Sequence, residues 1–353
     1  MSHQRTWTAV MVMTVLASGG PAVGQGLTLD PQQIIQAGGV NIDVGTYSVP
    51  SLVRWDADDL HDLLVGQGDG KVRVYLNIGT SDAPSFDVFS YVQDGGSDLS
   101  VGSSGCMGSF PRAVDWDRDG RLDLIVGESG SGYVKFFKNT AEGPGDPPQF
   151  NGATDLTHGP GTEVIAASSR CTPTIVDWNN DGNHDLITGG LDGCVRYYQN
   201  ASPSGMPALA QAAPVMVPVA GGGSEPLDVG ARSSPAVADM DGDGRKDLVI
   251  GQTDGKLRFY SNVGSDDAPA FSNFAYVQYD TGGGVLADID LPGSARSRPA
   301  VCDWNADGNL DLLVGGGDGL VRLYPGTPDP ATIILLLAGS LTFLIGRRSA
   351  RPR

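Results

Sequence analysis

Apolar residues recur in short runs along the chain, and the best defined of these runs alternate with polar residues. Residues 71–75, 256–260 and 320–324 each place apolar side chains two positions apart, which is typical of a half-buried β-strand. A glycine-rich turn precedes each of them, as at residues 68–70, and before the turn comes a continuous apolar run that ends in glycine, as at residues 63–66. Two apolar runs joined by Asp-Gly predict a β-hairpin.

Two further runs extend each hairpin to four predicted strands. Upstream, proline starts a β-prone run, as at residues 235–238 and 299–302, and downstream a looser run covers residues 276–289. An acidic segment separates the first run from the second, and its third residue lies at positions 56, 117, 179, 241 and 305, in steps of 61, 62, 62 and 64 residues. Four short strands per unit, repeated five times, predict an all-β fold, a five-bladed β-propeller with four-stranded antiparallel blades.

The two ends of the repeat region predict how the ring closes. The last unit stops after its third strand, at Tyr324, whereas residues 34–44 precede the first unit as residues 286–291 precede the last. We therefore expect the N-terminal segment to supply the fourth strand of the final blade and to remove an exposed sheet edge. The glycine-rich linkers 140–163 and 201–228 are too short for further blades.

The high glycine and proline content agrees with a fold that has many turns, and the net charge disfavours some classes of binding partner. The 353 residues include 51 Gly and 23 Pro, and only 18% are charged, which disfavours a helical protein. The net charge of −18 disfavours DNA, RNA and anionic lipid as partners. The acidic residues are concentrated in the repeats.

The first 24 residues have the features of a secretory signal. Arg5 precedes an apolar stretch at residues 7–17, and small residues follow up to an expected cleavage site before Gln25. We therefore expect export of the chain and a propeller domain at residues 25–326.

Residues 327–353 predict a sorting or anchoring segment. Pro328-Asp329-Pro330 is followed by an apolar stretch at residues 332–346 and then by four arginines. About fifteen apolar residues are marginal for a membrane span, although flanking arginines can extend it. The order resembles the PEP-CTERM sorting signal, with Asp329 where that family has Glu. The resemblance implies processing by an exosortase and delivery to the cell surface or extracellular matrix. The alternative is an ordinary C-terminal anchor; in both cases membrane contact is confined to this segment.

The acidic segments have the pattern of a cation-binding loop. Side-chain oxygens stand at positions 1, 3, 5 and 9, and glycine at position 6 permits a sharp turn. Ca²⁺ takes six to eight oxygen ligands in flexible geometry, whereas Mg²⁺ demands a stricter arrangement. Carboxylates packed this closely repel one another unless a cation is present.

These segments, with their period and flanking strands, resemble the FG-GAP or VCBS repeats of integrin α-chain propellers. The resemblance implies Ca²⁺ at one rim of the propeller in four of the five loops. The implied ligands are Asp115, Asp117, Asp119 and Asp123; Asp177, Asn179, Asp181 and Asp185; Asp239, Asp241, Asp243 and Asp247; and Asp303, Asn305, Asp307 and Asp311. The first loop departs from the pattern, with Arg54 at position 1 and Asp59 at position 6. We expect its remaining acids, Asp56, Asp58 and Asp62, to form a weak or empty site.

Tryptophan occupies position 2 of four loops, where the fourth loop has Met240. The regular placement of Trp55, Trp116, Trp178 and Trp304 predicts packing between neighbouring blades rather than stacking on a sugar or cofactor.

Three arginines share a position three residues before the proline of their blades: Arg170, Arg232 and Arg296, with Tyr47 and Gly108 in the other two repeats. We expect them at the channel mouth opposite the acidic loops. They either bind an anionic ligand or pair with the turn residues Asp192, Asp254 and Asp318, and the pairing is favoured.

The cysteines do not have metal-ligand spacing. In an exported chain Cys171 could pair with Cys106 or with Cys194, while Cys302 is expected in a strand.

The sequence is compatible with two functions. The sequence favours a surface adhesion or binding module for an unknown protein or glycan; the alternative is a secreted hydrolase or lyase acting on polysaccharide, since propellers also host enzymes. No Gly-x-Ser-x-Gly motif is present, and the acid pairs are accounted for as metal ligands. We therefore assign no catalytic residue and no cofactor other than Ca²⁺.

Overall fold

The computed structural model describes residues 26–102, 108–143, 146–159, 163–202, 205–219, 222–293 and 296–327. In these residues all regular structure is β-strand, which confirms the all-β prediction. None of the described segments forms a helix that could span a membrane. The predicted signal at residues 1–24 and, apart from Thr327, the predicted sorting segment at residues 327–353 lie outside the described residues.

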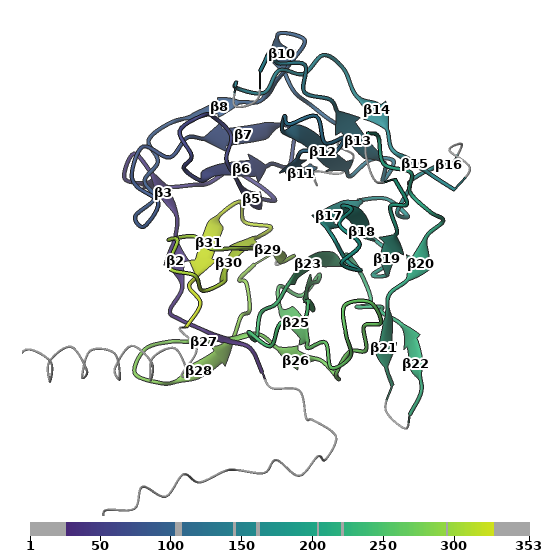
Figure 1. Cartoon of the computed structure of the whole chain (residues 1–353). Helices are drawn as coiled ribbons and strands as arrows, with labels where there is room; N and C mark the ends of the chain where they lie inside the picture. The colour runs from purple at the N-terminus through teal and green to yellow at the C-terminus, as the bar shows by residue number, and fades with distance from the viewer. Residues whose placement is uncertain are drawn as a thin grey trace, which may run out of the picture.

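Five four-stranded antiparallel sheets organise the described chain (Figure 1). The first three are β5 (Val49–Val53), β6 (Asp62–Gly66), β7 (Val72–Tyr75) and β8 (Phe89–Tyr91); β11 (Ser109–Val114), β12 (Asp123–Glu128), β13 (Val134–Phe137) and β14 (Thr154–Asp155); and β17 (Thr172–Val176), β18 (Asp185–Gly189), β19 (Val195–Tyr198) and β20 (Ala213–Pro214). The last two are β23 (Ser234–Ala238), β24 (Asp247–Gly251), β25 (Leu257–Tyr260) and β26 (Ala275–Tyr276); and β29 (Arg298–Cys302), β30 (Asp311–Gly315), β31 (Val321–Tyr324) and β2 (Gln33–Ile34).

The second strand of each sheet is buried along its whole length, which explains its continuous apolar sequence. Each of these strands includes a glycine where the neighbouring sheet comes closest. A Cβ atom on Gly127 would lie 1.9 Å from the carbonyl oxygen of Cys171, and one on Gly315 would lie 2.1 Å from that of Ser48. Glycine is required here because the backbone of the next sheet occupies the place of a side chain.

The fourth strands are shorter than predicted. Residues 276–289 were expected to form one strand, but only β26 pairs with β25, and the chain then folds into the hairpin of β27 (Gln278–Asp280) and β28 (Leu286–Asp288). Likewise, of residues 34–44 only Ile34 lies in β2, which pairs with β31, and the chain then folds into the hairpin of β3 (Gln36–Ala37) and β4 (Val40–Asn41). Gly38 and Gly39 have φ angles of 57° and 76°, and consecutive left-handed residues favour a tight hairpin turn over a continued strand.

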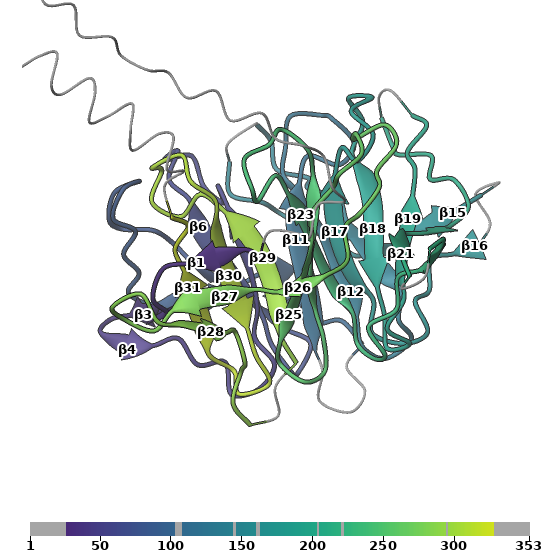
Figure 2. The ribbon, with the colours of Figure 1, turned by 90° about the horizontal axis from the view of Figure 1, so that it is seen from below.

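Four small sheets complete the outer part of the other units. They are β9 (Gln93–Asp94) with β10 (Ser97–Asp98); β15 (Thr157–His158) with β16 (Glu163–Val164); β21 (Met216–Pro218) with β22 (Ser224–Pro226); and β27 and β28 with β1 (Thr28–Leu29), which lies parallel to β27 (Figure 2). The linkers 140–163 and 201–228 therefore supply fourth strands and small hairpins.

Five apolar clusters fill the spaces between neighbouring sheets. Trp55 packs with Leu124 and Phe137 of the second sheet, and Trp304 packs with Leu63 of the first sheet. All four loop tryptophans are at most 8% exposed, and Met240 takes the corresponding place in the fourth unit. The predicted packing of tryptophans between blades is confirmed.

The sheets lie around a common centre (Figure 1). Their inner strands make contact in the order β5, β11, β17, β23 and β29, and β29 also contacts β5. In the view turned by 90°, these inner strands run through the thickness of the molecule (Figure 2). Sheets of this size and arrangement are consistent with propeller blades.

Candidate metal centre

The acidic loops connect the first and second strands of the five sheets, and neighbouring loops touch. The guanidinium of Arg118 in the second loop donates a hydrogen bond to the carbonyl oxygen of Gly182 in the third. Lys246, at the end of the fourth loop, donates to the side-chain oxygen of Asn180 in the third. These contacts place the second, third and fourth loops beside one another at one rim.

The aspartate at position 1 shapes four of the loops. Asp115 accepts hydrogen bonds from the backbone N–H groups of Asp119 and Gly120, both at 3.0 Å, and Asp177, Asp239 and Asp303 accept the corresponding pairs. The glycine at position 6 of each of these four loops has a left-handed φ angle of 85–87°. Position 1 thus folds the loop around the space where the other carboxylates meet.

The first loop is built differently. Arg54 replaces the position-1 carboxylate, and Asp59 takes the left-handed conformation, with φ 63°, that glycine takes in the other loops. Position 4 is left-handed in the other four loops, whereas Ala57 of the first loop has no positive φ. The backbone difference agrees with the prediction of a weak or empty site, which stays a prediction.

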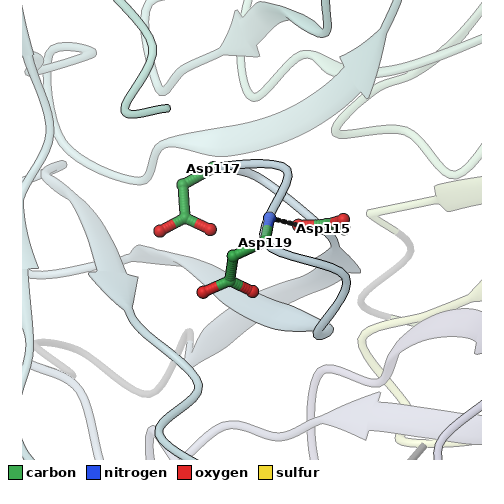
Figure 3. Close-up of side chains that lie close together, drawn as sticks. All are labelled: Asp115, Asp117 and Asp119. Atoms are coloured by element: carbon green, nitrogen blue, oxygen red, sulfur yellow. Dashed lines mark hydrogen bonds between the residues drawn. The ribbon is translucent and has the colours of Figure 1, made fainter. Parts of the chain in front are cut away.

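Within the part of the chain that the structure describes, two groups of three carboxylates could hold a metal ion. Asp115, Asp117 and Asp119 each have an oxygen within 4.8 Å of the others, and their side chains gather in one loop (Figure 3). The Oδ1 atom of Asp117 is buried and has no hydrogen-bond partner among the described groups. A buried carboxylate oxygen without a partner is costly unless a cation meets it, so this oxygen fits a metal ligand.

The second group, in the fourth loop, contains Asp239, Asp241 and Asp247. The two groups use different members of the predicted ligand sets. Asp123 lies outside the group in the second loop, and Asp243 lies outside the group in the fourth, where it pairs with Arg245.

The aspartate at position 9 ties each loop to the end of its third strand. These five aspartates are at most 1% exposed; they are Asp62, Asp123, Asp185, Asp247 and Asp311. One oxygen of Asp123 accepts the backbone N–H of Trp116 at 3.1 Å, and the other accepts that of Asn139 at 2.8 Å. The same pair of hydrogen bonds occurs in the other four loops. Oδ2 of Asp185 also accepts the hydroxyl of Tyr197 at 3.1 Å. A carboxylate oxygen with a single hydrogen bond retains a lone pair, so this structural role is compatible with a metal bond in the other loops.

Burial raises the pKa of all five position-9 aspartates. The pKa of Asp123 rises to about 6, with the nearby charge of Asp117 adding to burial. The pKa of Asp247 rises to about 7 through burial together with the charges of Asp241 and Asp243. Neighbouring carboxylate charges add to burial at both residues, and a bound cation would relieve this repulsion.

Basic side chains already contact the second loop. Lys138, which follows β13, places its Nζ 2.8 Å from Asp119 Oδ2 and also contacts Asp117. Arg121 pairs with Asp119. Burial opposes ionisation of Asp119, but these hydrogen bonds outweigh it and lower its pKa. A metal ion in this loop would therefore compete with the ammonium group of Lys138.

The third and fifth loops have asparagine at position 3. The amide nitrogen of Asn179 donates to Asp181 at 3.0 Å, and that of Asn305 donates to Asp307 at 2.9 Å. These amides turn their NH₂ groups toward the carboxylates that the resemblance assigns to a cation. Binding there requires each amide to rotate by half a turn, so that its oxygen faces the ion.

A repeated asparagine supports the loops and was not identified from the sequence. Asn77, Asn139, Asn200 and Asn262 stand two residues after the last residue of the third strand, and each is at most 3% exposed. The side-chain oxygen of Asn139 accepts the backbone N–H groups of Ala141 and Gln149 at 2.9 and 3.1 Å. The recurring order aromatic-x-Asn after the third strand was the available signal.

The structure brings together the three arginines that share a position before the inner strands. Arg170, Arg232 and Arg296 line one cavity. Their favoured pairing with turn aspartates is wrong for two of the aspartates, because Asp192 pairs with Arg196 and Asp318 pairs with Arg322 on the third strands.

The disulfide expectations for Cys171 are not met, because Cys171 and Cys194 are free thiols. Burial raises the pKa of Cys171 to about 12. Cys302 is a free thiol in β29, as expected, and Cys106 lies outside the described residues.

Comparison with protein families gives a match for part of the chain. Residues 115–188 and 177–250 match the family described as FG-GAP-like repeat. The two matches together span residues 115–250, which is less than half of the chain. Each match begins at position 1 of an acidic loop, so the repeat boundaries agree with those read from the period. The match supports the repeat family and a propeller-like fold. No curated protein matches the chain.

Solved structures with some similarity are distant. The Tc holotoxin pore of Photorhabdus luminescens is 14% identical, with a TM-score of 0.39 over 83% of this chain and 14% of that chain. A lectin of Agrocybe aegerita, described as recognising non-reducing terminal N-acetylglucosamine, is 20% identical, with a TM-score of 0.39 over 78% of this chain and 64% of that chain. In both cases this chain spans less than two thirds of the length of the structure it resembles.

Proposed function

We propose that this protein is an exported, calcium-binding β-propeller that serves as an adhesion or protein- and glycan-binding module at the cell surface or in the extracellular matrix. The observation that carries the proposal is the group of Asp115, Asp117 and Asp119 within an FG-GAP-like repeat, with one buried carboxylate oxygen that lacks a partner. FG-GAP-like repeats fit a binding module.

The ring order supports five blades closed by the N-terminal segment. The inner strands contact one another in a cycle, and β2 adds the fourth strand to the sheet of β29, β30 and β31. An apolar cluster also joins the last sheet to the first, with Trp304 packed against Leu63. These contacts favour a complete ring without an exposed edge at this junction.

Ca²⁺ is the cation that suits the loops. The donor set consists of carboxylate, amide and carbonyl oxygens, which are hard ligands suited to Ca²⁺. Bound Ca²⁺ would neutralise the clustered carboxylates and fix the loop conformation. The proposed ligands are the sixteen residues at positions 1, 3, 5 and 9 of the second to fifth loops. We propose a structural role for the ion and a binding rather than a catalytic role for the protein.

Thermal unfolding with and without calcium tests the metal. A site with a Kd of about 10⁻³ M contributes about 1.4 kcal/mol at about 10 mM Ca²⁺, and four such sites about 6 kcal/mol. We expect EDTA to lower the Tm by about 10 °C and Ca²⁺, but not an equal concentration of Mg²⁺, to restore it. An unchanged melt in EDTA would overturn the calcium proposal.

Capture experiments test the binding function. The protein, immobilised with and without Ca²⁺, is exposed to extracellular proteins and to a glycan array, and retained molecules are identified. We expect calcium-dependent retention of a defined protein or glycan. Retention of nothing in either condition contradicts the binding module and favours a purely structural envelope role.

A further inference from the structure

We propose that Arg170, Arg232, Arg296 and Arg298 form a binding site for one oxyanion group, a sulfate, phosphate or carboxylate, at the channel mouth opposite the acidic loops. The first three residues precede the inner strands and Arg298 begins one, whereas the acidic loops follow these strands. The site therefore lies at the other end of the channel and uses none of the calcium ligands. It goes beyond the proposed function and does not depend on it.

The backbone at the mouth is unusual in the same way in all five units. Arg170, Arg232 and Arg296 have φ angles of 57°, 60° and 64°, and the equivalent Tyr47 and Gly108 have 58° and 75°. Left-handed backbone costs a side chain of this kind about 1 kcal/mol or more, whereas glycine adopts it freely. Glycine at Gly108 shows that the fold itself needs no side chain here. Three of the five equivalent positions thus carry arginine in a conformation that disfavours a side chain.

The guanidinium groups converge on a cavity that contains no acid. Arg170, Arg232, Arg296 and Arg298 line it with Phe110 and three serines and a threonine, and no carboxylate belongs to the described lining. Arg170 Nη1, Arg232 Nε and Arg298 Nη1 are buried and have no hydrogen-bond partner among the described groups. Arg298 is only 5% exposed. Three unsatisfied donors around one cavity define a site for an acceptor with several oxygens.

Aromatic rings hold two of the arginines in place. The guanidinium of Arg296 lies 4.6 Å from the centre of the Tyr47 ring, and that of Arg298 lies 5.2 Å from Tyr47 and 5.4 Å from Phe110. Stacking of this kind orients a guanidinium without neutralising it. The donors are thus positioned before any ligand arrives.

The four guanidinium groups concentrate positive charge around one cavity. Burial lowers the pKa of Arg170 to about 10, and the charges of Arg232 and Arg296 add to the effect. Burial likewise lowers the pKa of Arg298 to about 9, with Arg296 and Arg170 contributing. Guanidinium groups stay charged at neutral pH, so their burial is unfavourable without a counter-ion. Two of the turn carboxylates, Asp192 and Asp318, pair with third-strand arginines instead.

The size of the cavity limits the occupant to a single anionic group. Its volume of ≈ 20 Å³ accommodates about one water-sized group in the present side-chain arrangement. Arg170 and Arg232 are partly exposed, so they can move outward to admit an oxyanion. The remainder of a larger ligand, such as a sugar ring, would stay outside the mouth.

Sulfate binding to the whole protein tests the site. Inorganic sulfate up to about 10 mM is titrated at constant ionic strength against chloride, by calorimetry and by thermal unfolding. We expect saturable binding to the wild type and at least tenfold weaker binding to R170Q/R232Q, which removes two of the three mouth arginines while keeping Arg296 and Arg298. The variant R73Q/R258Q removes two arginines from equivalent third-strand positions and is expected to bind as the wild type does.

Two results would overturn the proposal. One is the absence of saturable sulfate binding to the folded wild type; the other is equal sulfate affinity in R170Q/R232Q and R73Q/R258Q. Circular dichroism establishes that each variant is folded, and R170Q and R232Q are measured singly if the double variant is not. Since no calcium ligand is involved, EDTA-treated protein that remains folded is expected to bind sulfate equally well.

A second comparison identifies the source of the oxyanion. A sulfated oligosaccharide and its desulfated form are titrated against the same proteins. Tighter binding of the sulfated form than of free sulfate, lost in R170Q/R232Q, assigns the site to an anionic glycan. Equal affinity for both assigns it to a free anion.

Discussion

Replacing Lys138 by glutamine tests whether the second acidic loop has the electrostatics of a cation site. The ammonium group of Lys138 lies 2.8 Å from an oxygen of Asp119 and also contacts Asp117. It therefore pairs with two of the carboxylates that a metal ion would bind. Glutamine is the natural residue at the equivalent position of the third unit, Gln199. The substitution should therefore be accommodated without a change in fold.

The expected gain follows from the geometry. Two unit charges 2.8 Å apart attract by about 1.5 kcal/mol in a medium as polar as water. The lysine side chain is 44% exposed, and the ordering of its chain offsets part of this attraction, which leaves about 1 kcal/mol for Ca²⁺ to displace. Removing the competitor should raise the Ca²⁺ affinity of this loop about fivefold.

The measurement isolates one loop. In a background of D181N, D243N and D307N, which weakens the other three sites, Tb³⁺ luminescence sensitised by Trp116 reports the second loop, and Ca²⁺ competition gives its affinity. The control K135Q makes the same change in net charge at a lysine that pairs with Asp155 instead. The reasoning is refuted if K138Q binds Ca²⁺ no more tightly than K135Q.

Three further variants probe the ring and its buried charges. S297A removes a hydroxyl that bridges neighbouring sheets with hydrogen bonds of 2.6 and 3.0 Å, and should cost about 2 kcal/mol in urea unfolding; a loss below about 0.5 kcal/mol would contradict the bridge. G315A should cost about 3 kcal/mol by the same assay, because its Cβ would lie 2.1 Å from the Ser48 carbonyl oxygen; wild-type stability would argue against the close approach of the last and first sheets. Burial opposes ionisation of Asp318, but Arg322 outweighs it and lowers its pKa, so this stabilisation is complete above pH 3.8 and is lost as pH falls through the lower folded value. D318N should therefore cost about 2 kcal/mol at pH 7 and less at pH 2 to 3, and a pH-independent difference would contradict the ion pair.

Local sequence patterns predicted the parts of the fold that have a strict period. The alternating run at residues 71–75 contains β7, and the apolar run at residues 63–66 lies in β6, because side-chain period and strand burial are directly linked. The outer strands were predicted less well. Their pairing is short, and Gly38 and Gly39 turn the N-terminal segment into a hairpin after two paired residues.

The candidate metal loops were found from the spacing of their aspartates, but the division of labour within each loop was not. Sequence treats the aspartates at positions 1, 3, 5 and 9 as equivalent oxygen donors. In the structure, Asp123 accepts two backbone N–H groups from distant parts of its unit, whereas Asp117 keeps a buried oxygen without a partner. Such differences depend on which backbone groups the fold brings to each carboxylate.

By itself, the sequence determined the repeat, the acidic loops and the placement of tryptophan between blades, because each depends on residues close together in the chain. Only the tertiary structure decided which charges meet. It joins Asp192 to Arg196 rather than to Arg170, and it brings Arg298 together with Arg170 and Arg232 from other units around one cavity. Electrostatic interactions depend on distance in space, and residues from different units are brought within that distance only when the sheets assemble around a common centre.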